Sequence, residues 1–155
     1  MCHAFQRMLR WLLRIWRPLP GPLKQAYLRL RYGWHGVGVA ALIRDKDGRI
    51  LLVHRTYSDD EPWALPGGWL EGNEPIEAAL ERELLEETGF RVRVGRPSAV
   101  EHAGFAVVLL MEAELLDGAA EFRASAEVSE VAWVTLAEAR QLSRVNARLL
   151  RRALA

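Results

Sequence analysis

The 155-residue chain contains one cysteine, Cys2, so an intramolecular disulfide bond and a disulfide-stapled fold are both excluded. The sequence lacks internal repeats and low-complexity tracts. It also lacks an apolar run long enough to span a bilayer, because the segment at 11–16 is short and contains Arg14. No small-residue cleavage site of a signal peptide is evident. These absences predict a cytoplasmic protein.

Acidic residues are missing from residues 1–44, which carry eight Arg or Lys, whereas the whole chain has a formal net charge of only +1. This asymmetry indicates a basic arm attached to an acidic body. The chain is 50% hydrophobic and 26% charged, which is typical of one ordinary globular domain. The sequence predicts an N-terminal extension at 1–33 and a domain at 34–155.

The extension contains a predicted amphipathic helix at 4–17, followed by the proline-rich linker "RPLPGPLK" at 17–24. Its apolar face opposes four arginines, Arg7, Arg10, Arg14 and Arg17. Such a face suits peripheral contact with anionic lipid. The favoured alternative is packing on its own domain or on a partner subunit in a homodimer. Nothing beyond charge supports nucleic-acid binding, so no nucleic-acid partner is expected.

The body contains β-rich runs mixed with helical ones. Runs at 36–44 and 49–55, joined by "DKDG", predict a hairpin, and further strands are predicted at 91–95, 106–116 and 130–136. The stretch 63–75 reads as irregular and glycine-rich. Helices are predicted at 75–88, 136–142 and 144–154, the first framed by Pro75 and Gly89. This mixture predicts a layered α/β or α+β domain.

Three glutamates of the helix at 75–88 stand out by their position. On a helical projection Glu83 and Glu87 continue the apolar stripe of Ile76, with Glu86 at its margin, whereas a solvated face is expected for the other acids. A carboxylate partly removed from water must be paired, protonated or bound to a cation. Arg82 alone cannot neutralise three glutamates. A hard divalent cation such as Mg²⁺ can, because it prefers oxygen ligands.

The segment "GWLEGNEPIEAALERELLEETGF" at 68–90 resembles the Nudix (MutT-type) hydrolase box, G-x5-E-x7-R-E-U-x-E-E-x-G-U, where U is a bulky apolar residue. Every specified position is filled, by Gly68, Glu74, Arg82, Glu83, Leu84, Glu86, Glu87, Gly89 and Phe90. The resemblance extends to "WALPGG" before the box and "EVAWVTLAEA" after it, but not to residues 1–33. It implies an α/β/α sandwich with a mixed β-sheet.

The resemblance also implies roles for these residues. Glu83 and Glu87 would be the main ligands of Mg²⁺ or Mn²⁺, and Glu86 a further ligand or the base that activates water. Arg82 would orient a glutamate through a salt bridge, and Gly68 would bring its carbonyl close to the metal. Glu74 is expected to be structural. A further acid from a downstream loop is expected, with Glu127 preferred and Glu130 second.

Three residues other than the specified positions of the box are candidate substrate contacts. Arg55 and Tyr57 follow the second predicted strand toward the glycine-rich loop, where an ordinary polar loop is the alternative. Trp69 comes directly after Gly68 and is placed to stack on a base, with packing against the loop as the alternative.

The resemblance implies hydrolysis of a diphosphate linkage in a nucleoside diphosphate linked to another group. The segment "HAGFAVV" at 102–108 lacks the proline and the tyrosine that are frequent in family members acting on ADP-ribose and on dinucleoside polyphosphates, respectively. Nucleoside triphosphates and nucleotide sugars remain as substrates. The alternative is a catalytically silent Nudix-fold module that binds nucleotides.

Overall fold

The computed structural model describes residues 20–23, 26, 36–104, 106–116 and 121–154, and the helix predicted at 4–17 lies outside them. The chain divides into two compact units, Met1–Trp34 and His35–Ala155. Within the described ranges, no helix has the length and apolar character needed to cross a membrane.

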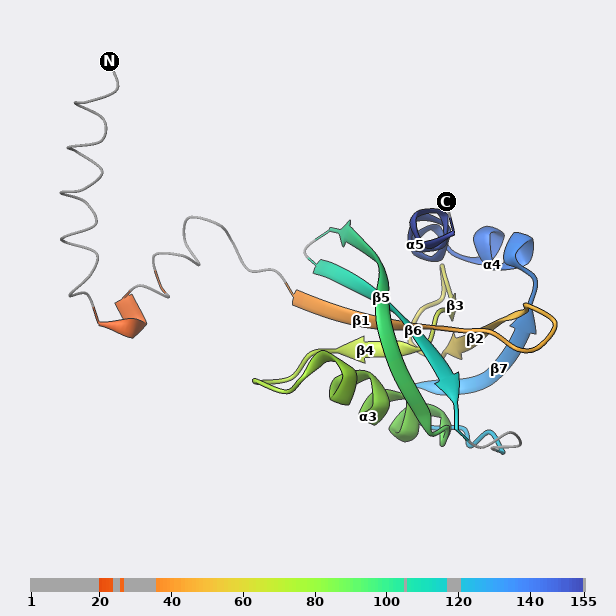
Figure 1. Ribbon diagram of the computed structural model, residues 1–155, viewed down its shortest axis with the longest axis horizontal. Helices are drawn as coiled ribbons and strands as arrows, with labels where there is room; N and C mark the ends of the chain where they lie inside the picture. Colours follow the sequence, from red (N-terminus) through yellow and green to blue (C-terminus); the bar gives the residue numbers. More distant parts are fainter. Residues whose placement is uncertain (1–19, 24–25, 27–35, 105, 117–120, 155) are drawn as a thin grey trace, which may run out of the picture. The chain divides into compact units, whose positions relative to one another are not determined.

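Two β-sheets form the middle of the larger unit (Figure 1). The four-stranded sheet has the order β4-β1-β6-β5, made of Gly67–Trp69, Gly36–Ile43, Ala106–Leu115 and Val92–Ala103. The strands β1 and β6 run parallel and the other pairs antiparallel, so this sheet is mixed as expected. The three-stranded sheet has the antiparallel order β3-β2-β7, made of Trp63–Ala64, Ile50–Arg55 and Val128–Val134.

Helices cover both faces of these sheets. On one side α3 (Ile76–Thr88) buries Ala79, Leu80 and Leu84 against alternate residues of β1, β2 and β6. On the other side α4 (Leu136–Leu142) and α5 (Arg144–Ala153) pack on the remaining residues of the same strands. Figure 1 shows α3 on the opposite side of the sheets from α4 and α5. The predicted α/β/α sandwich is therefore confirmed.

The ends of α3 are set by local chemistry. Pro75 is the residue before the helix, with ψ of 146°, and Gly89 ends it in the left-handed conformation, with φ of 75°. The N–H of Gly89 donates to the carbonyl of Leu85 at 3.0 Å. A left-handed residue after the last turn is the usual place for glycine. The helix 75–88 is thus confirmed to within one residue.

The hairpin prediction for 36–44 and 49–55 is wrong. The turn itself forms, because the N–H of Gly48 donates to the carbonyl of Asp45 at 3.0 Å. Beyond a single antiparallel bridge between Arg44 and Ile50, however, β1 and β2 separate into different sheets. Both strands are buried on both faces, so each takes its partners from distant parts of the chain.

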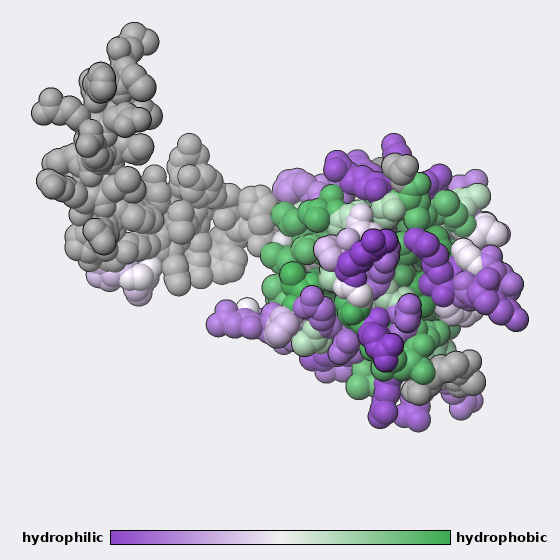
Figure 2. All heavy atoms as spheres, viewed as in Figure 1, coloured by the Kyte–Doolittle hydropathy of each residue, from purple (hydrophilic) through white to green (hydrophobic). Residues whose placement is uncertain are grey.

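The strand predicted at 91–95 is much longer in the structure, because β5 extends to Ala103. It passes Pro97 through two register shifts in its pairing with β6. β5 is an edge strand, where a residue without an N–H is tolerated. The stretch 63–75 also contains more structure than expected, namely the short strands β3 and β4. Figure 2 shows one face of this unit, where hydrophobic residues are visible between groups of hydrophilic ones.

Candidate active site

The pairing of β4 with β1 places Gly68 opposite Val39, next to the inward side of α3. A Cβ atom built on Gly68 would overlap the carboxyl group of Glu83. Glycine at this position therefore lets the Glu83 carboxylate lie against the backbone of the loop. Gly68 and Glu83 are in contact, although they belong to different elements.

Arg82 holds the acidic side chains of the box together. Its guanidinium binds both carboxylate oxygens of Glu74, at 2.9 Å from Nη2 and 3.3 Å from Nε. Its Nη1 also donates to Glu83 at 3.1 Å and to Glu86 at 3.3 Å. Arg82 consequently lowers the pKa of Glu74 from its usual range. One cation is thus shared among three carboxylates.

Among the described residues Glu87 has no such partner, and only 9% of its surface is exposed. Burial, followed by the nearby charges of Glu83 and Glu127, raises the pKa of Glu87 to about 7. Arg55 acts in the opposite direction but does not offset these effects. Glu87 is therefore a buried carboxyl group whose charged form is disfavoured first by burial and then by neighbouring carboxylates.

Glu127 reaches the site through the pairing of β2 with β7. The N–H of Thr56, just after β2, donates to the carbonyl of Glu127 at 2.8 Å, and the Thr56 hydroxyl donates to the carbonyl of Ala126 at 2.7 Å. These bonds hold the segment before β7 beside the loop after β2. Glu127 is thereby brought near Glu87, some 40 residues away in the sequence.

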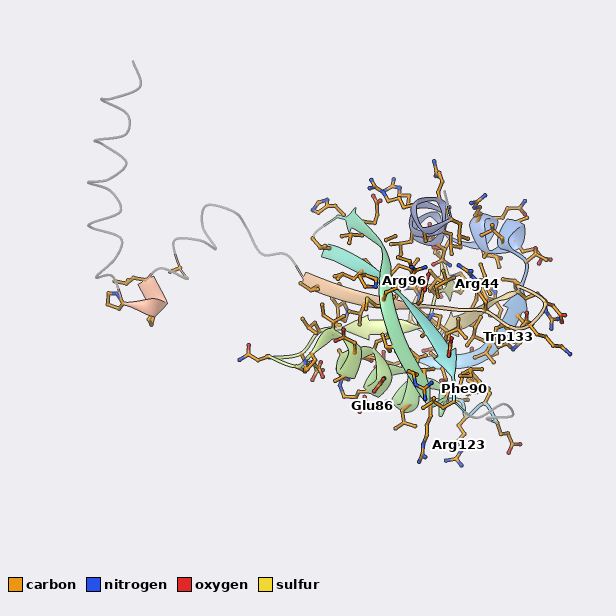
Figure 3. The ribbon with its side chains drawn as sticks, in the orientation of Figure 1. Arg44, Glu86, Phe90, Arg96, Arg123 and Trp133 are labelled. Atoms are coloured by element: carbon orange, nitrogen blue, oxygen red, sulfur yellow. The ribbon has the colours of Figure 1, made fainter. Side chains whose placement is uncertain are left out.

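All of the preferred site residues line a single cleft of about 620 Å³. They are Arg55, Tyr57, Gly68, Trp69, Arg82, Glu83, Glu86, Glu87 and Glu127. The second candidate for the downstream acid, Glu130, does not line this cleft; it lies within β7 opposite His54. Figure 3 labels Glu86 on α3, where its side chain is 62% exposed.

The three substrate candidates occupy the walls of the cleft. Tyr57 is 63% exposed and Trp69 is 49% exposed. The guanidinium of Arg55 lies 5.7 Å from the centre of the Tyr57 ring and donates to the carbonyl of Glu61 at 2.7 Å. Its Nε is buried without a hydrogen-bond partner among the described residues. Arg55 therefore retains an unused donor in a cleft that otherwise gathers carboxylates.

Sequence reasoning missed Asn146, which lines the same cleft from α5. Asn146 is 2% exposed, and its Oδ1 accepts a hydrogen bond from the N–H of Leu65 at 3.1 Å. Its Nδ2 is the other buried side-chain atom of the described residues without a partner. A polar residue within the apolar pattern of the last helix was the available signal. Only the fold reveals that it faces the cleft.

The residues present fit a hard divalent cation by charge and by ligand type. Five glutamates line the cleft, Glu71, Glu83, Glu86, Glu87 and Glu127, against two guanidiniums, those of Arg55 and Arg82. Within the described part of the chain, no three His, Cys, Asp or Glu side chains are already grouped to hold a metal ion. The carboxylates repel one another, and Arg82 draws two of them toward itself.

Comparisons with known proteins agree with this geometry. The profile of the NUDIX domain family matches residues 34–153. A "MutT-like protein" of Streptomyces ambofaciens is 38% identical over 102 residues, which cover 65% of this chain and 64% of that protein. The "CTP pyrophosphohydrolase" of Escherichia coli K12 is 41% identical over 61 residues, covering 38% of this chain and 45% of that protein. The chain thus spans only part of the length of these relatives.

A solved structure gives the same result for the fold. The solution structure of the E. coli ORF135 protein superposes with a TM-score of 0.61 and 29% sequence identity. The superposition covers 77% of this chain and 88% of that one. Family profile, relatives and fold agree with the glutamate-rich box on α3: the chain belongs to the Nudix (NUDIX domain) family.

Proposed function

We propose that the protein is a divalent-metal-dependent hydrolase that cleaves a diphosphate linkage in a nucleoside diphosphate linked to another group. The observation that carries this proposal is the surplus of carboxylates in one cleft, where five glutamates face two guanidiniums and Glu87 is buried among them. An uncompensated cluster of this kind is costly unless a cation binds it. Mg²⁺ is the preferred ion and Mn²⁺ the alternative.

Glu83, Glu87 and Glu127 are the proposed carboxylate ligands, with the backbone carbonyl of Gly68 beside them. When bound, the metal screens the phosphate charges and makes an attacking water more acidic. Glu86 is the proposed base, or a further ligand, because its side chain is 62% exposed at the cleft, where a water molecule can contact the carboxylate. Arg82 keeps Glu83 and Glu86 in place through its ion pairs.

In this reaction a water oxygen bonds to one phosphorus atom of the diphosphate while its proton passes to the base. The bond from that phosphorus to the bridging oxygen breaks, and the second phosphate departs with the electron pair. Arg55 is proposed to bind a phosphate oxygen through its unpartnered Nε. Tyr57 and Trp69 are proposed to contact the nucleoside.

Nucleoside triphosphates and nucleotide sugars are the proposed substrates, the former supported by the relative named as a CTP pyrophosphohydrolase. The test is a phosphate-release screen over both classes with Mg²⁺ and with Mn²⁺. Glu86→Gln and Glu87→Gln should each reduce turnover at least about 100-fold while the circular dichroism spectrum stays unchanged. An exposed helix position, Glu77→Gln, is the matched control.

Absence of turnover with every substrate would contradict hydrolysis and favour the silent nucleotide-binding module. Near wild-type rates in both variants would overturn the residue assignment instead. These two failures are separate, because the first concerns the reaction and the second concerns the residues.

For the arm at 4–17 we propose that its apolar face packs on protein, either its own domain or a partner subunit, rather than on lipid. Co-sedimentation with vesicles of anionic phospholipid should then recover the full chain and a chain that starts at Trp34 equally. Loss of vesicle binding on truncation would show that the arm is a peripheral membrane anchor. Light scattering on both chains tests the homodimer.

A further inference from the structure

The indole of Trp69 lies against the beginning of β1. Trp69 belongs to β4, which pairs antiparallel with β1 (Figure 1). A Cβ atom built on Gly36 would lie 2.7 Å from Cζ3 of Trp69 and 3.2 Å from Cε3. Carbon atoms in contact prefer about 3.5–4.0 Å. The benzene ring of the indole therefore lies directly against the backbone at Gly36, in space that a side chain there would occupy.

The backbone conformation at Gly36 does not itself require glycine. The glycines with positive φ are Gly48, Gly67, Gly72, Gly89 and Gly104, and Gly36 is not among them. Glycine weakens a strand and often marks a close approach of another group. The space taken by the indole is consequently the structural reason for glycine at position 36.

Gly38, two residues along the same strand, differs in this respect. A Cβ atom on Gly38 would lie 3.5 Å from Cγ2 of Val108, 3.7 Å from the carbonyl oxygen of Gly68 and 3.9 Å from Cζ3 of Trp69, all ordinary contact distances. Alanine is thus accommodated at Gly38 but not at Gly36 without displacing Trp69. The two positions form a matched pair on one strand.

Trp69 is held on one side by β1, while 49% of its surface is exposed and the residue lines the cleft. An aromatic ring fixed in this way loses little conformational entropy when another ring stacks on it. Stacking of a nucleobase on an aromatic side chain contributes about 1–3 kcal/mol.

We propose that Gly36 is a positioning residue for substrate binding: its missing side chain seats Trp69 as a fixed stacking wall for the nucleobase. The inference rests on the proposed function and specifies the substrate further. The group that occupies this part of the cleft is a planar aromatic ring, so the nucleobase rather than a sugar lies against Trp69.

The test compares Gly36→Ala, Trp69→Ala, the double variant and the control Gly38→Ala, each in the full chain with its metal. Gly36→Ala and Trp69→Ala should each raise KM for the best nucleotide substrate about tenfold with kcat changed less than about twofold. Gly38→Ala should keep the wild-type KM. Methylenediphosphonate, an inhibitor without a ring, should inhibit all four variants with the wild-type affinity.

The double variant distinguishes positioning from a general structural effect. Once Trp69 is removed, alanine at position 36 has no ring to displace, so Gly36→Ala should not raise KM further in that background. An unchanged KM in Gly36→Ala, or equal increases with and without Trp69, would overturn the proposal. If the wild-type protein hydrolyses no nucleotide, the proposed function fails. The same variants are then compared by calorimetric titration with nucleotide, where equal affinity of Gly36→Ala and wild type overturns the inference.

Discussion

The carboxyl group of Glu87 should destabilise the metal-free fold, although it is a proposed metal ligand. Its carboxyl is buried beside Glu83 and Glu127, and its pKa is raised to about 7 against 4.5 for an ordinary glutamate. Between these two pH values the folded protein binds more protons than the unfolded chain. Its free energy of unfolding therefore falls as the pH rises through this range.

Replacement of Glu87 by glutamine removes this loss in the metal-free protein. Since each pKa unit corresponds to about 1.4 kcal/mol, Glu87→Gln should be more stable than wild type by on the order of 3 kcal/mol at pH 8, with the difference narrowing toward pH 4.5. Urea unfolding in EDTA at pH 5 and pH 8 measures this. Glu77→Gln is the control, and a difference between Glu87→Gln and wild type that does not depend on pH would contradict the assignment.

Replacement of Asn146 is predicted to affect both stability and substrate binding. Its Oδ1 accepts from the N–H of Leu65, while its Nδ2 lacks a partner among the described residues. Asn146→Ala leaves a buried N–H unpartnered, so we expect a loss of about 1–3 kcal/mol in urea unfolding. We also expect an increase in KM, because the donor on the cleft wall is removed.

Arg148→Ala, at an exposed position on the same helix, serves as the control. A variant at Asn146 that loses stability but keeps the wild-type KM would show that this amide is structural alone.

At the scale of elements, Arg82 connects the loop that holds Glu74 to α3. Lysine retains the charge but cannot bind both oxygens of Glu74 and reach Glu83 and Glu86 as well. Arg82→Lys should therefore lower kcat/KM roughly 10- to 100-fold, the range for residues that orient metal ligands. Because Arg82 is partly exposed, the loss of stability should stay below about 1 kcal/mol.

Arg96→Lys is the matched control, because Arg96 also binds one glutamate, Glu112, through two nitrogens and does not line the cleft. Equal loss of activity in both variants would indicate a general effect of replacing arginine. Full activity of Arg82→Lys would show that a point charge is sufficient.

The elements differ in how far the sequence determines them. The helices α3 and α4 were predictable because their apolar spacing and their capping residues agree, with Thr135 and Glu138 forming a reciprocal cap on α4. The separation of β1 and β2 into two sheets was not predictable. The turn at Asp45–Gly48 is local, whereas the sheet that each strand joins depends on distant strands. Gly95 and Pro97 are typical of the end of a strand, so the sequence predicted a strand shorter than β5.

The site residues were likewise predictable where they lie close together in the sequence. Glu83, Glu86 and Glu87 share one helix, so their spacing alone placed them together. Asn146 reaches Leu65 across 81 positions of the chain, and no local pattern predicts such a contact. The long-range pairing of β2 with β7 likewise determines that Glu127, rather than Glu130, lines the cleft.

At the scale of the whole molecule, metal binding should stabilise the folded protein. A ligand that binds only the folded state adds about 2.7 kcal/mol at 100 times its dissociation constant. Mg²⁺ should therefore raise the thermal midpoint of the wild-type protein in proportion to its concentration on a logarithmic scale. Differential scanning calorimetry at constant ionic strength, set with NaCl, measures the shift.

Glu83→Gln should show a much smaller shift with Mg²⁺, because a proposed ligand is lost. An equal shift in Glu83→Gln and wild type would place the stabilising ion elsewhere on the protein.

The strands β1, β2 and β6 each supply alternate residues to the core under α3 and to the core under α4 and α5. Neither core can be assembled without the strands that also form half of the other. Loss of one core should therefore cause loss of both, and the domain should unfold in a single cooperative step. Amide protons of Leu42 and Leu52 should then exchange with solvent only through global unfolding, at a rate common to both.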